Sequence, residues 1–323
     1  MVASENNPTP SISVVMCTYN GEQYLKGQLD SILKQTYPIL ELIVQDDGST
    51  DNTCAIIQEY AEKYPFIKLY KNEKQLGINQ NFFSVLQRVQ SDFIAISDQD
   101  DIWMVDKLEK QMECIGQHDI CASAYYIDFV HTDKMERITR PHFSTERRFF
   151  ENDIPGHTML IRKSLLETVP LPAPIFYDHW LAVCANLHHG ITVVDKPLNW
   201  HRPHRNAATH SVSEMHHHNN MFVPYIKGLT RWHELHKTTR WSNYHQYIEQ
   251  QTADIQKFVV VHKMSILMQK KNILSLFRLS CLFAKHRKCL YPHSSKGLRA
   301  CFRAFSFPLM HAYYHYAEFV SWD

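Results

Sequence analysis

Three clusters of polar residues each follow a short apolar run of the sequence, and they contain most of the side chains that could take part in chemistry. Residues 18–21 (TYNG) follow ISVVMC, residues 46–51 (DDGSTD) follow LELIVQ, and residues 98–101 (DQDD) follow FIAIS. In a doubly wound sheet, ligands bind at the carboxyl ends of the strands. We therefore expect these clusters to meet in one cleft, although they lie far apart in the sequence.

The cluster at 98–101 places three carboxylates within four residues. Such groups repel one another unless a cation compensates. Hard oxygen ligands favour Mg²⁺ or Mn²⁺, and such an ion is the usual partner of a substrate diphosphate. The alternative is a solvated loop in which Asp101 caps the following turn. The position directly after a buried strand favours the metal site.

The cluster at 46–51 has a structural duty, because Ser49 to Asp51 are suited to capping the next helix. Asp46 and Asp47 remain, and a carboxylate at a strand end is suited to accept hydrogen bonds from a nucleobase N–H group or from ribose hydroxyls. Tyr19 could stack on the base, and Thr18 adds a short hydrogen-bonding side chain. These residues therefore indicate a nucleotide-binding edge.

The elements that would position the clusters alternate between β-rich and helical segments. Strands are expected at 12–17, 40–45, 66–70 and 93–97, and helices near 22–34, 52–63 and 79–90. This βαβαβαβ order predicts a parallel sheet with helices on both faces. Later strands are expected at 121–130, 156–161, 191–195 and 197–202, with a long loop or lid at 131–152 and a helix from Asp178.

Composition excludes several classes of protein. The 323 residues are 44% hydrophobic, which is enough for a large core, and only 9 are glycine. Neither G-x-G-x-x-G nor G-x-x-x-x-G-K-[ST] occurs, so Rossmann and P-loop sites are disfavoured. The eight cysteines lack disulfide-like or metal-like spacing and read as reduced core residues. The N-terminus does not resemble a signal peptide, and no apolar run is long enough to span a membrane.

The net charge of +1 conceals an asymmetry along the chain. Residues 1–220 hold 19 Lys/Arg and 28 Asp/Glu, whereas residues 221–323 hold 15 and 5. Strand signals end near residue 212, so we expect a helical, basic C-terminal region at 213–323. Its cations Arg278, Lys285, Arg287 and Lys288 surround an apolar face, which fits an anionic membrane surface. Packing against the protein, or dimerisation, would explain the same pattern.

The three clusters also carry a family resemblance. CTYNG (17–21), QDDGSTDNT (45–53) and SDQDDIW (97–103) resemble, in this order and spacing, the family 2 inverting glycosyltransferases with the GT-A fold. The last motif is similar to a bacterial rhamnosyltransferase-like branch that elongates surface polysaccharides. The resemblance covers roughly residues 11–210. It implies an α/β, GT-A-type doubly wound mixed sheet in a nucleotide-sugar-binding catalytic domain at 1–212.

The resemblance implies a DxD motif at Asp98-Gln99-Asp100. Asp100 would be the direct ligand of Mn²⁺ or Mg²⁺, and Asp98 would lie nearer the ribose or the sugar. Residues expected to contact the nucleotide or the donor sugar are Thr18, Tyr19, Asn20, Asp46, Asp47, Lys74, Asp98, Gln99, Trp103, Gly156, His157, Arg202 and Arg205.

Several of these residues keep a structural alternative. Gly156 corresponds to the family's acceptor-side glycine, where the chain passes close to the donor sugar, and His157 beside it would shape sugar or acceptor choice. Trp103 either walls the sugar pocket or packs in the core. Lys74 either meets phosphate or is a solvated loop lysine.

Inverting transfer needs a base that removes the acceptor hydroxyl's proton as its oxygen attacks the anomeric carbon. In the family this base is an Asp before an aromatic-rich helix, and FYDHWL (176–181) fits that pattern. Asp178 is therefore the candidate catalytic base. A helix N-cap is its alternative role, and the two roles are compatible.

Residues 199–210 (NWHRPHRNAATH) resemble the family's closing segment. His204 would be a third metal ligand or a diphosphate contact, and Arg202 or Arg205 could neutralise the leaving phosphates. His201 stands where an aromatic residue is common. Two imidazoles in this segment leave open which one meets the metal or the diphosphate.

Together these features predict a cytoplasmic, inverting glycosyltransferase that associates peripherally with the inner face of the membrane. The preferred donor is dTDP-rhamnose, with UDP-hexoses as the alternative, and the acceptor is a lipid-linked saccharide or polysaccharide. A non-catalytic nucleotide-sugar-binding assembly subunit is a rival hypothesis, and the intact carboxylate set disfavours it. Nucleic-acid binding through the basic region is disfavoured because no recognised module is present.

Overall fold

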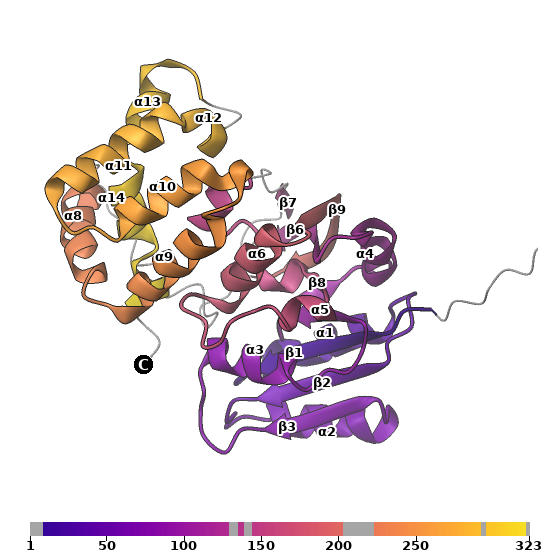
Figure 1. Ribbon diagram of the computed structural model, residues 1–323. Coiled ribbons are helices and arrows are strands. Elements are labelled where there is room, and N and C mark those ends of the chain that lie inside the picture. Colours follow the sequence, from indigo (N-terminus) through magenta and orange to yellow (C-terminus); the bar gives the residue numbers. More distant parts are fainter. Residues whose placement is uncertain (1–8, 129–134, 139–143, 203–222, 292–294, 321–323) are drawn as a thin grey trace, which may run out of the picture. The chain divides into compact units, whose positions relative to one another are not determined.

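The computed structural model describes residues 9–128, 135–138, 144–202, 223–291 and 295–320 (Figure 1). Contacts divide the chain into two compact units. The first unit contains residues 1–139, 155–169 and 189–202, and the second contains 140–154, 170–188 and 203–323. The boundary predicted near residue 212 lies outside the described residues and stays a prediction. The second unit also takes in two segments that the sequence assigns to the catalytic domain.

The first unit is built on a nine-stranded mixed sheet in the order β3-β2-β1-β4-β8-β6-β9-β5, with β7 paired to β6. Its four-stranded parallel part is β1 (Ile12–Thr18), β2 (Glu41–Asp46), β3 (Ile67–Lys71) and β4 (Phe93–Ser97), and β6 and β9 also pair in parallel. The remaining strands are β5 (Ile102–Trp103), β6 (Ile120–Asp128), β7 (Met135–Ile138), β8 (Leu160–Arg162) and β9 (Ile191–His201). This confirms the predicted α/β fold with a mixed sheet.

The strand order determines where the helices lie. Because βαβ crossovers are right-handed, α1 (Glu22–Leu33) and α2 (Thr53–Lys63) cover one face as the chain moves outward from β1 to β3. The chain then reverses to β4, which puts α3 (Ile78–Leu86) on the opposite face. Contacts of α1 with α2, and of α3 with β1 and β2, agree with this arrangement. In doubly wound sheets ligands bind at such a reversal, which here lies at the carboxyl ends of β1 and β4.

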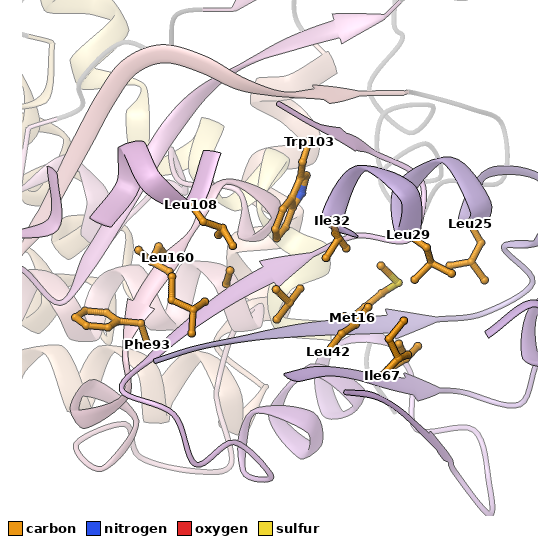
Figure 2. Close-up of a cluster of buried hydrophobic side chains, with 14 of the residues drawn as sticks. Met16, Leu25, Leu29, Ile32, Leu42, Ile67, Phe93, Trp103, Leu108 and Leu160 are labelled. Carbon is orange, nitrogen blue, oxygen red and sulfur yellow. The ribbon is translucent and has the colours of Figure 1, made fainter. Parts of the chain in front are cut away.

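Alternation along β1 supplies the core on one face of the sheet. Ile12, Val14 and Met16 are fully buried and pack in one cluster with Leu25 and Leu29 of α1 (Figure 2). Side chains two residues apart share a strand face, whereas those four apart share a helix face, so the two patterns meet. Each fully buried aliphatic side chain of this kind contributes about 1.5–3 kcal/mol relative to an exposed one.

Three predicted elements differ from those observed. The strand expected at 156–161 is the 3-10 helix η2 (Gly156–Thr158) followed by β8. The two strands expected at 191–195 and 197–202 are one strand, β9, although Pro197 lies inside it. The ladder between β6 and β9 is irregular at Ser123/Ala124, and Pro197 lies opposite Ala124 there, so the missing N–H group is tolerated. Part of the loop predicted at 131–152 is ordered as β7 and as the short 3-10 helix η1 (Arg147–Phe149).

The second unit is helical, as the sequence predicts for its C-terminal part. Its helices of eight or more residues are α6 (Tyr177–Leu187), α8 (Val223–Leu235), α9 (Thr239–Thr252), α10 (Val259–Met268), α11 (Ile273–Lys285), α13 (Gly297–Phe305) and α14 (Phe307–Tyr314). Shorter ones, besides η1, are η3 (Gln256–Phe258), α12 (Arg287–Leu290) and α15 (Tyr316–Val320). Among the described residues, no helix combines the length and the apolar character needed to cross a bilayer.

A buried carboxylate ties α15 to α6 in this unit. Glu318 Oε2 lies 2.9 Å from His179 Nδ1, and Glu318 Oε1 lies 2.5 Å from His315 Nδ1. Burial alone would raise the pKa of Glu318, but the two imidazoles outweigh it and hold that pKa well below its usual range. Burial also opposes a charge on His315, yet the Glu318 carboxylate outweighs it and raises the pKa of His315.

Replacing Glu318 tests this network. Glu318→Ala leaves buried imidazoles without their counter-charge, so we expect the free energy of unfolding to fall by about 3–5 kcal/mol near pH 6. The pKa of His315 is raised in the folded state, so its stabilising contribution is full below the ordinary histidine value of about 6.5 and fades as the pH rises through the raised value. The loss should therefore be smaller near pH 9.

Urea unfolding at both pH values, followed by circular dichroism, measures the difference. Glu62→Ala, which truncates an exposed glutamate of α2, is the matched control and should change little. Equal losses for Glu318→Ala at the two pH values would contradict a charged His315.

Candidate functional site

Strand β9 supplies two of the polar side chains of the site. Asn199 and His201 are two residues apart and therefore project from the same face of the strand. The short strand β5 pairs antiparallel with this end of β9, with Ile102 opposite Trp200. Asp101 directly precedes β5, and this pairing places its carboxylate beside His201.

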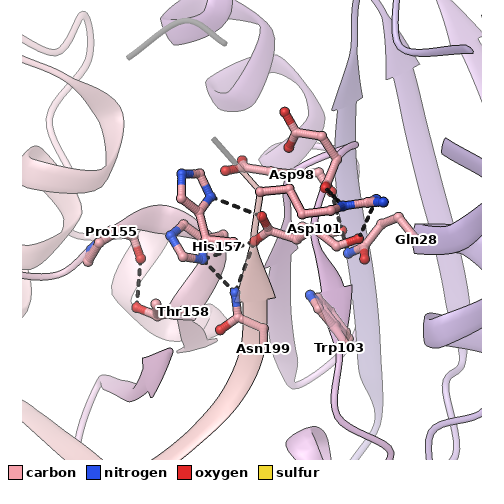
Figure 3. A network of polar contacts seen from close by, with 12 residues as sticks. Gln28, Asp98, Asp101, Trp103, Pro155, His157, Thr158 and Asn199 are labelled. Atoms are coloured by element: carbon pink, nitrogen blue, oxygen red, sulfur yellow. Dashed lines mark hydrogen bonds and ion pairs between the residues drawn. The ribbon is translucent and has the colours of Figure 1, made fainter. Parts of the chain in front are cut away.

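Both oxygens of the Asp101 carboxylate are engaged, and the residue is 0% exposed. Oδ1 lies 3.0 Å from His201 Nδ1, and Oδ2 lies 3.1 Å from His157 Nδ1. Asn199 Nδ2 donates a 3.0 Å hydrogen bond to Oδ2, and Figure 3 shows Asp101, His157 and Asn199 converging. Both rings are therefore held through Nδ1, and neither Nε2 has a hydrogen-bond partner among the described residues.

The charges of this cluster are coupled. Burial alone would raise the pKa of Asp101, but His157 and His201 outweigh it and hold that pKa well below its ordinary value. Burial opposes a charge on His201, yet its hydrogen bond and proximity to Asp101 raise the pKa of His201. For His157 burial dominates, and its pKa is lowered. At neutral pH the carboxylate is ionised, and His201 is the more basic ring.

His157 belongs to the 3-10 turn η2 (Gly156–Thr158), which is fixed on both sides. Thr158 Oγ1 donates to the Pro155 carbonyl at 2.7 Å, and Gln111 Nε2 donates to the Thr158 carbonyl at 2.8 Å. The buried Lys107 donates to the His157 carbonyl at 3.3 Å. Burial lowers the pKa of Lys107 to about 8. The position of the His157 ring is therefore set by its backbone as well as by Asp101.

Four side chains could hold a metal ion. Asp98, Asp101, His157 and His201 each offer one ligand atom, and these atoms all lie within 4.8 Å of one another. Carboxylate oxygens and imidazole nitrogens are ligands of divalent metals, and a ligating histidine commonly directs its other ring nitrogen to a carboxylate, as His201 does to Asp101. The donor set therefore fits a divalent cation. Asp100 is buried and is not one of the four, so its predicted role as direct ligand stays a prediction.

Arg202 clamps the loop that carries these carboxylates. Its Nε donates to the Asp100 carbonyl at 2.6 Å, and its Nη2 donates to the carbonyls of Asp101 at 3.2 Å and Tyr24 at 3.3 Å. The guanidinium also lies 5.0 Å from the centre of the Tyr24 ring. Arg202 is thus at the predicted site, where it holds the backbone of the DxD loop. Its contact with phosphate stays a prediction.

The Asp46 carboxylate organises the turn after β2. Oδ1 accepts hydrogen bonds from Thr18 Oγ1 at 2.9 Å and Ser49 Oγ at 2.5 Å, and Oδ2 accepts from the amides of Gly48 and Ser49. Asn20 Oδ1 accepts from the amide of Thr50 at 2.8 Å. These contacts bring the ends of β1 and β2 together, as we expected for the polar clusters that follow the two strands. The Asp46 carboxylate thus stabilises the loop between β2 and α2.

The Asp47 carboxylate likewise stabilises the loop after β3 by accepting hydrogen bonds. Its Oδ1 accepts from Asn72 Nδ2 and from the amide of Leu76, each at 2.7 Å, and its Oδ2 accepts from the amide of Gly77 at 2.9 Å. Gly77 has φ of 76°, a conformation that disfavours other residues. Lys74 lies exposed on this loop. The loop after β3, which carries Lys74, is therefore fixed to the turn after β2.

Tyr19 and Gln99 join the ends of β1 and β4. The Tyr19 amide donates to Gln99 Oε1, and Gln99 Nε2 donates to the Tyr19 carbonyl, both at 3.0 Å. A Cβ on the neighbouring Gly21 would lie 2.2 Å from Gln99 Oε1, so a larger residue there would displace the Gln99 amide from Tyr19. The Tyr19 residue is 46% exposed, which leaves it accessible to a ligand.

Trp103 is 3% exposed and belongs to the core cluster of Figure 2. The Lys107 ammonium lies 5.0 Å from the centre of its ring. Of the two roles expected for Trp103, a wall of the sugar pocket or packing in the core, this position agrees with packing in the core. Its packing in the core anchors β5, the strand that directly follows Asp101.

Asp178 lies in the second unit, in the first turn of α6, whose N-cap residue is Phe176. Its Oδ1 accepts a 2.7 Å hydrogen bond from the amide of His179. Burial raises the pKa of Asp178, and the nearby charge of Glu318 acts in the same direction, while hydrogen bonds from His179 and Asn152 partly offset both. The carboxylate is therefore more basic than an ordinary aspartate.

The first unit thus brings the three predicted clusters to one edge of its sheet, together with His157, His201 and Arg202. His204 and Arg205 lie outside the described residues. Sequence reasoning missed Asp101 as the residue that holds both histidines, and it missed Asn199 altogether. The available signals were a third carboxylate beside the DxD motif and the two-residue spacing of Asn199 and His201.

Comparison with known proteins places this geometry in a family. Residues 13–169 match the family model described as Glycosyl transferase family 2. The chain is 34% identical over 158 residues to the dTDP-rhamnosyl transferase RfbG of Shigella flexneri, which covers 47% of this chain and 55% of that protein. It is 30% identical over 172 residues to the UDP-Glc:alpha-D-GlcNAc-diphosphoundecaprenol beta-1,3-glucosyltransferase WfgD of Escherichia coli, covering 53% of this chain and 67% of that protein.

Solved structures show the same fold. The chain superimposes on Staphylococcus aureus TarS 1–349 in complex with UDP-GlcNAc with a TM-score of 0.55, at 16% identity, covering 94% of this chain and 89% of that one. For the mannosyltransferase PcManGT from Pyrobaculum calidifontis in complex with GDP-Man and Mn²⁺, the TM-score is 0.55 at 16% identity, with coverages of 98% and 88%. The fold is that of the GT-A glycosyltransferases, and the chain belongs to glycosyl transferase family 2.

The ligand set of the cluster can be tested by Mn²⁺ titration. We expect His201→Ala and Asp98→Ala to remove a ligand and Asp101→Asn to misorient the histidines, so each should weaken Mn²⁺ binding by about 10-fold or more. Electron paramagnetic resonance of free Mn²⁺ measures the affinity.

The same titration with Asp100→Ala tests whether Asp100 is also a ligand. If Asp100 binds the metal directly, as the DxD motif predicts, this variant should weaken Mn²⁺ binding; if only the four clustered side chains bind it, the affinity should stay unchanged. Glu62→Gln, an exposed carboxylate change on α2, is the control. Unchanged Mn²⁺ affinity in all three cluster variants would remove the cluster as the metal site.

Proposed function

We propose that the protein is an inverting glycosyltransferase that moves a sugar from a nucleoside-diphosphate donor to a hydroxyl group of a saccharide acceptor, with a divalent metal ion at the donor site. The observation that carries this proposal is the Asp98, Asp101, His157 and His201 cluster at the strand ends of a family 2 chain. A metal there would neutralise the diphosphate leaving group.

The donor is proposed to be dTDP-rhamnose. The SDQDDIW motif resembles a rhamnosyltransferase-like branch, and the Shigella relative is named as a dTDP-rhamnosyl transferase. A UDP-hexose is the second candidate, since the Escherichia coli relative is named for UDP-Glc and the TarS structure contains UDP-GlcNAc. Either donor presents a base and a diphosphate.

The fixed loops of the first unit support nucleotide binding. Asp46 and Asp47 hold the two loops rigid through backbone amides, so a nucleotide would enter a site that needs little reorganisation. The exposed Tyr19 ring is available to stack on the base. Arg202 and Lys74 are the cations proposed to face the diphosphate, together with Arg205 or His204.

Asp178 is proposed as the general base. Its raised pKa makes the carboxylate a better proton acceptor than an ordinary aspartate. In the reaction it would take the proton of the acceptor hydroxyl as that oxygen forms the new glycosidic bond. The bond between the anomeric carbon and the diphosphate oxygen breaks on the opposite side, which inverts the configuration.

The acceptor is proposed to be lipid-linked, as in the synthesis of a bacterial surface polysaccharide such as O-antigen or capsule. The name of the Escherichia coli relative specifies a diphosphoundecaprenol-linked acceptor. A lipid-linked acceptor would require this protein to work at a membrane surface. Peripheral association with the inner face of the cytoplasmic membrane is therefore part of the proposal.

Nucleotide titration tests the donor site. We expect calorimetry to show Mn²⁺-dependent binding of dTDP that is tighter than that of UDP or GDP, because the metal neutralises the diphosphate charge. His201→Ala should lose the Mn²⁺-dependent part. Tighter binding of UDP would favour the hexose alternative, and absence of binding by any of the three would overturn the proposal in favour of a non-catalytic assembly subunit.

Replacing the proposed base should separate catalysis from donor binding. We expect Asp178→Asn to lower transfer by about 100-fold or more while nucleotide affinity stays unchanged, as for loss of a general base. Asp254→Asn, an exposed aspartate between α9 and η3, is the matched control.

The pH profile of the unchanged protein gives a second measure. Because the pKa of Asp178 is raised, the transfer rate should decline on the acid side of the profile with a midpoint above the ordinary aspartate pKa of about 3.9. Near-normal transfer by Asp178→Asn would exclude it as the base, and so would an acid limb that persists in that variant.

A further inference from the structure

The last helices of the chain contain a long segment with charges of only one sign. Residues 255–317 include 11 lysine and arginine residues and no aspartate or glutamate, so this segment of 63 residues has no internal acidic partner for its cations. The nearest acidic residues in the sequence are Asp254 and Glu318, and Glu318 is buried with His179 and His315. A surface of this composition is suited to an anionic partner.

Helix α11 presents large apolar side chains to solvent. Ile273, Leu274 and Phe277 are 70%, 55% and 58% exposed. Helical spacing places Arg278 and Lys285 on the same exposed arc as Leu274, because residues four and eleven positions later return to nearly the same direction. The arc is therefore apolar and cationic at once.

Helix α13 has the same character. Leu298 is 89% exposed and Phe302, one turn later, is 60% exposed, with the exposed Arg299 between them on the flank of this stripe. Helices α11 and α13 are in contact, and the rings of Phe277 and Phe305 lie 5.9 Å apart. The two stripes therefore lie on neighbouring helices, and we call them together the α11–α13 face.

These exposed side chains are not needed for the core of the second unit. The opposite sides of the two helices already bury Leu276, Leu279, Phe283, Ala300 and Ala304. Exposed leucine and phenylalanine side chains that gather on one surface mark an interaction site. The α11–α13 face therefore fits a partner that is both apolar and anionic.

We propose that the α11–α13 face binds the surface of a bilayer that contains anionic lipids. Aliphatic and aromatic side chains such as Leu298 and Phe302 would enter the boundary between headgroups and acyl chains, while Arg278 and Arg299 meet the lipid phosphates. A second copy of this chain is a poor occupant, because it would bring the same positive charges together. Nucleic acid would leave the aliphatic side chains without partners.

Vesicle sedimentation of the full chain tests this assignment. We expect the protein to sediment with vesicles of phosphatidylcholine containing about 30% phosphatidylglycerol, and to bind much less to phosphatidylcholine alone. Raising the ionic strength from about 0.05 M to about 0.5 M should release most of the bound protein, because salt screens the cations.

Two pairs of exposed substitutions separate the charged and apolar contributions. Arg278→Gln with Arg299→Gln should lower partitioning by about 30-fold, roughly five-fold for each charge. Leu298→Ser with Phe302→Ser should weaken binding to the anionic vesicles and lessen the part that survives high salt. Lys26→Gln with Lys63→Gln, two exposed cations of the first unit, is the matched control and should bind like the unchanged protein.

This inference rests on the membrane association included in the proposed function and assigns it to a surface. Circular dichroism and Mn²⁺-dependent nucleotide binding of the same variants should be unchanged, which distinguishes failure of the α11–α13 face from failure of the donor site. Equal binding to neutral and anionic vesicles, or an equal loss in the control pair, would overturn the inference. So would a dimer in the unchanged protein that the Leu298→Ser/Phe302→Ser pair converts to a monomer. That result would assign the face to self-association.

Discussion

A buried carboxylate needs compensation, and the arrangement of Asp101 between two imidazoles is the constraint on which the site of the first unit depends. Desolvation of an ionised carboxylate is costly unless nearby groups offset it. His157, His201 and Asn199 do so, and they come from two places in the sequence, the turn η2 and the end of β9. The 3-10 turn before β8, the end of β9 and the β5–β9 pairing are therefore fixed together by one charge.

The second unit solves the same physical problem with a different carboxylate. Glu318 lies between His179 and His315, and His179 neighbours Asp178 on α6. Burial is the main reason that the pKa of Asp178 is raised; within the network, the Glu318 charge acts in the same direction and His179 acts against it. In both units a buried ion cluster therefore contributes to the electrostatics of a candidate functional group, because buried charges are screened less than exposed ones.

In the loops at the strand ends, residues that stabilise the fold are different from those available to a ligand. The carboxylate oxygens of Asp46 and Asp47 accept hydrogen bonds from backbone amides, which makes the loops rigid. Ligand contacts are therefore left to exposed groups such as Tyr19. In the helical region, by contrast, some apolar and basic side chains have no role in the core. Its core is complete beneath α11 and α13, so Phe277, Leu298 and the arginines next to them in sequence remain exposed, within a stretch (255–317) whose sequence contains no acidic residue.

The sequence by itself determined the βαβ order, the polar strand ends, the basic helical region and the family, because periodicity, turn chemistry and motif order are local properties. Only the tertiary structure decided that Asp101 holds both histidines, that Trp103 lies in the core and that Arg202 grips the DxD loop. Those contacts join residues that are tens of positions apart, and the pairing of β5 with β9 that creates them leaves no local pattern. The partners of Glu318 were likewise invisible in the sequence, since burial, which makes them matter, is a property of the packed chain.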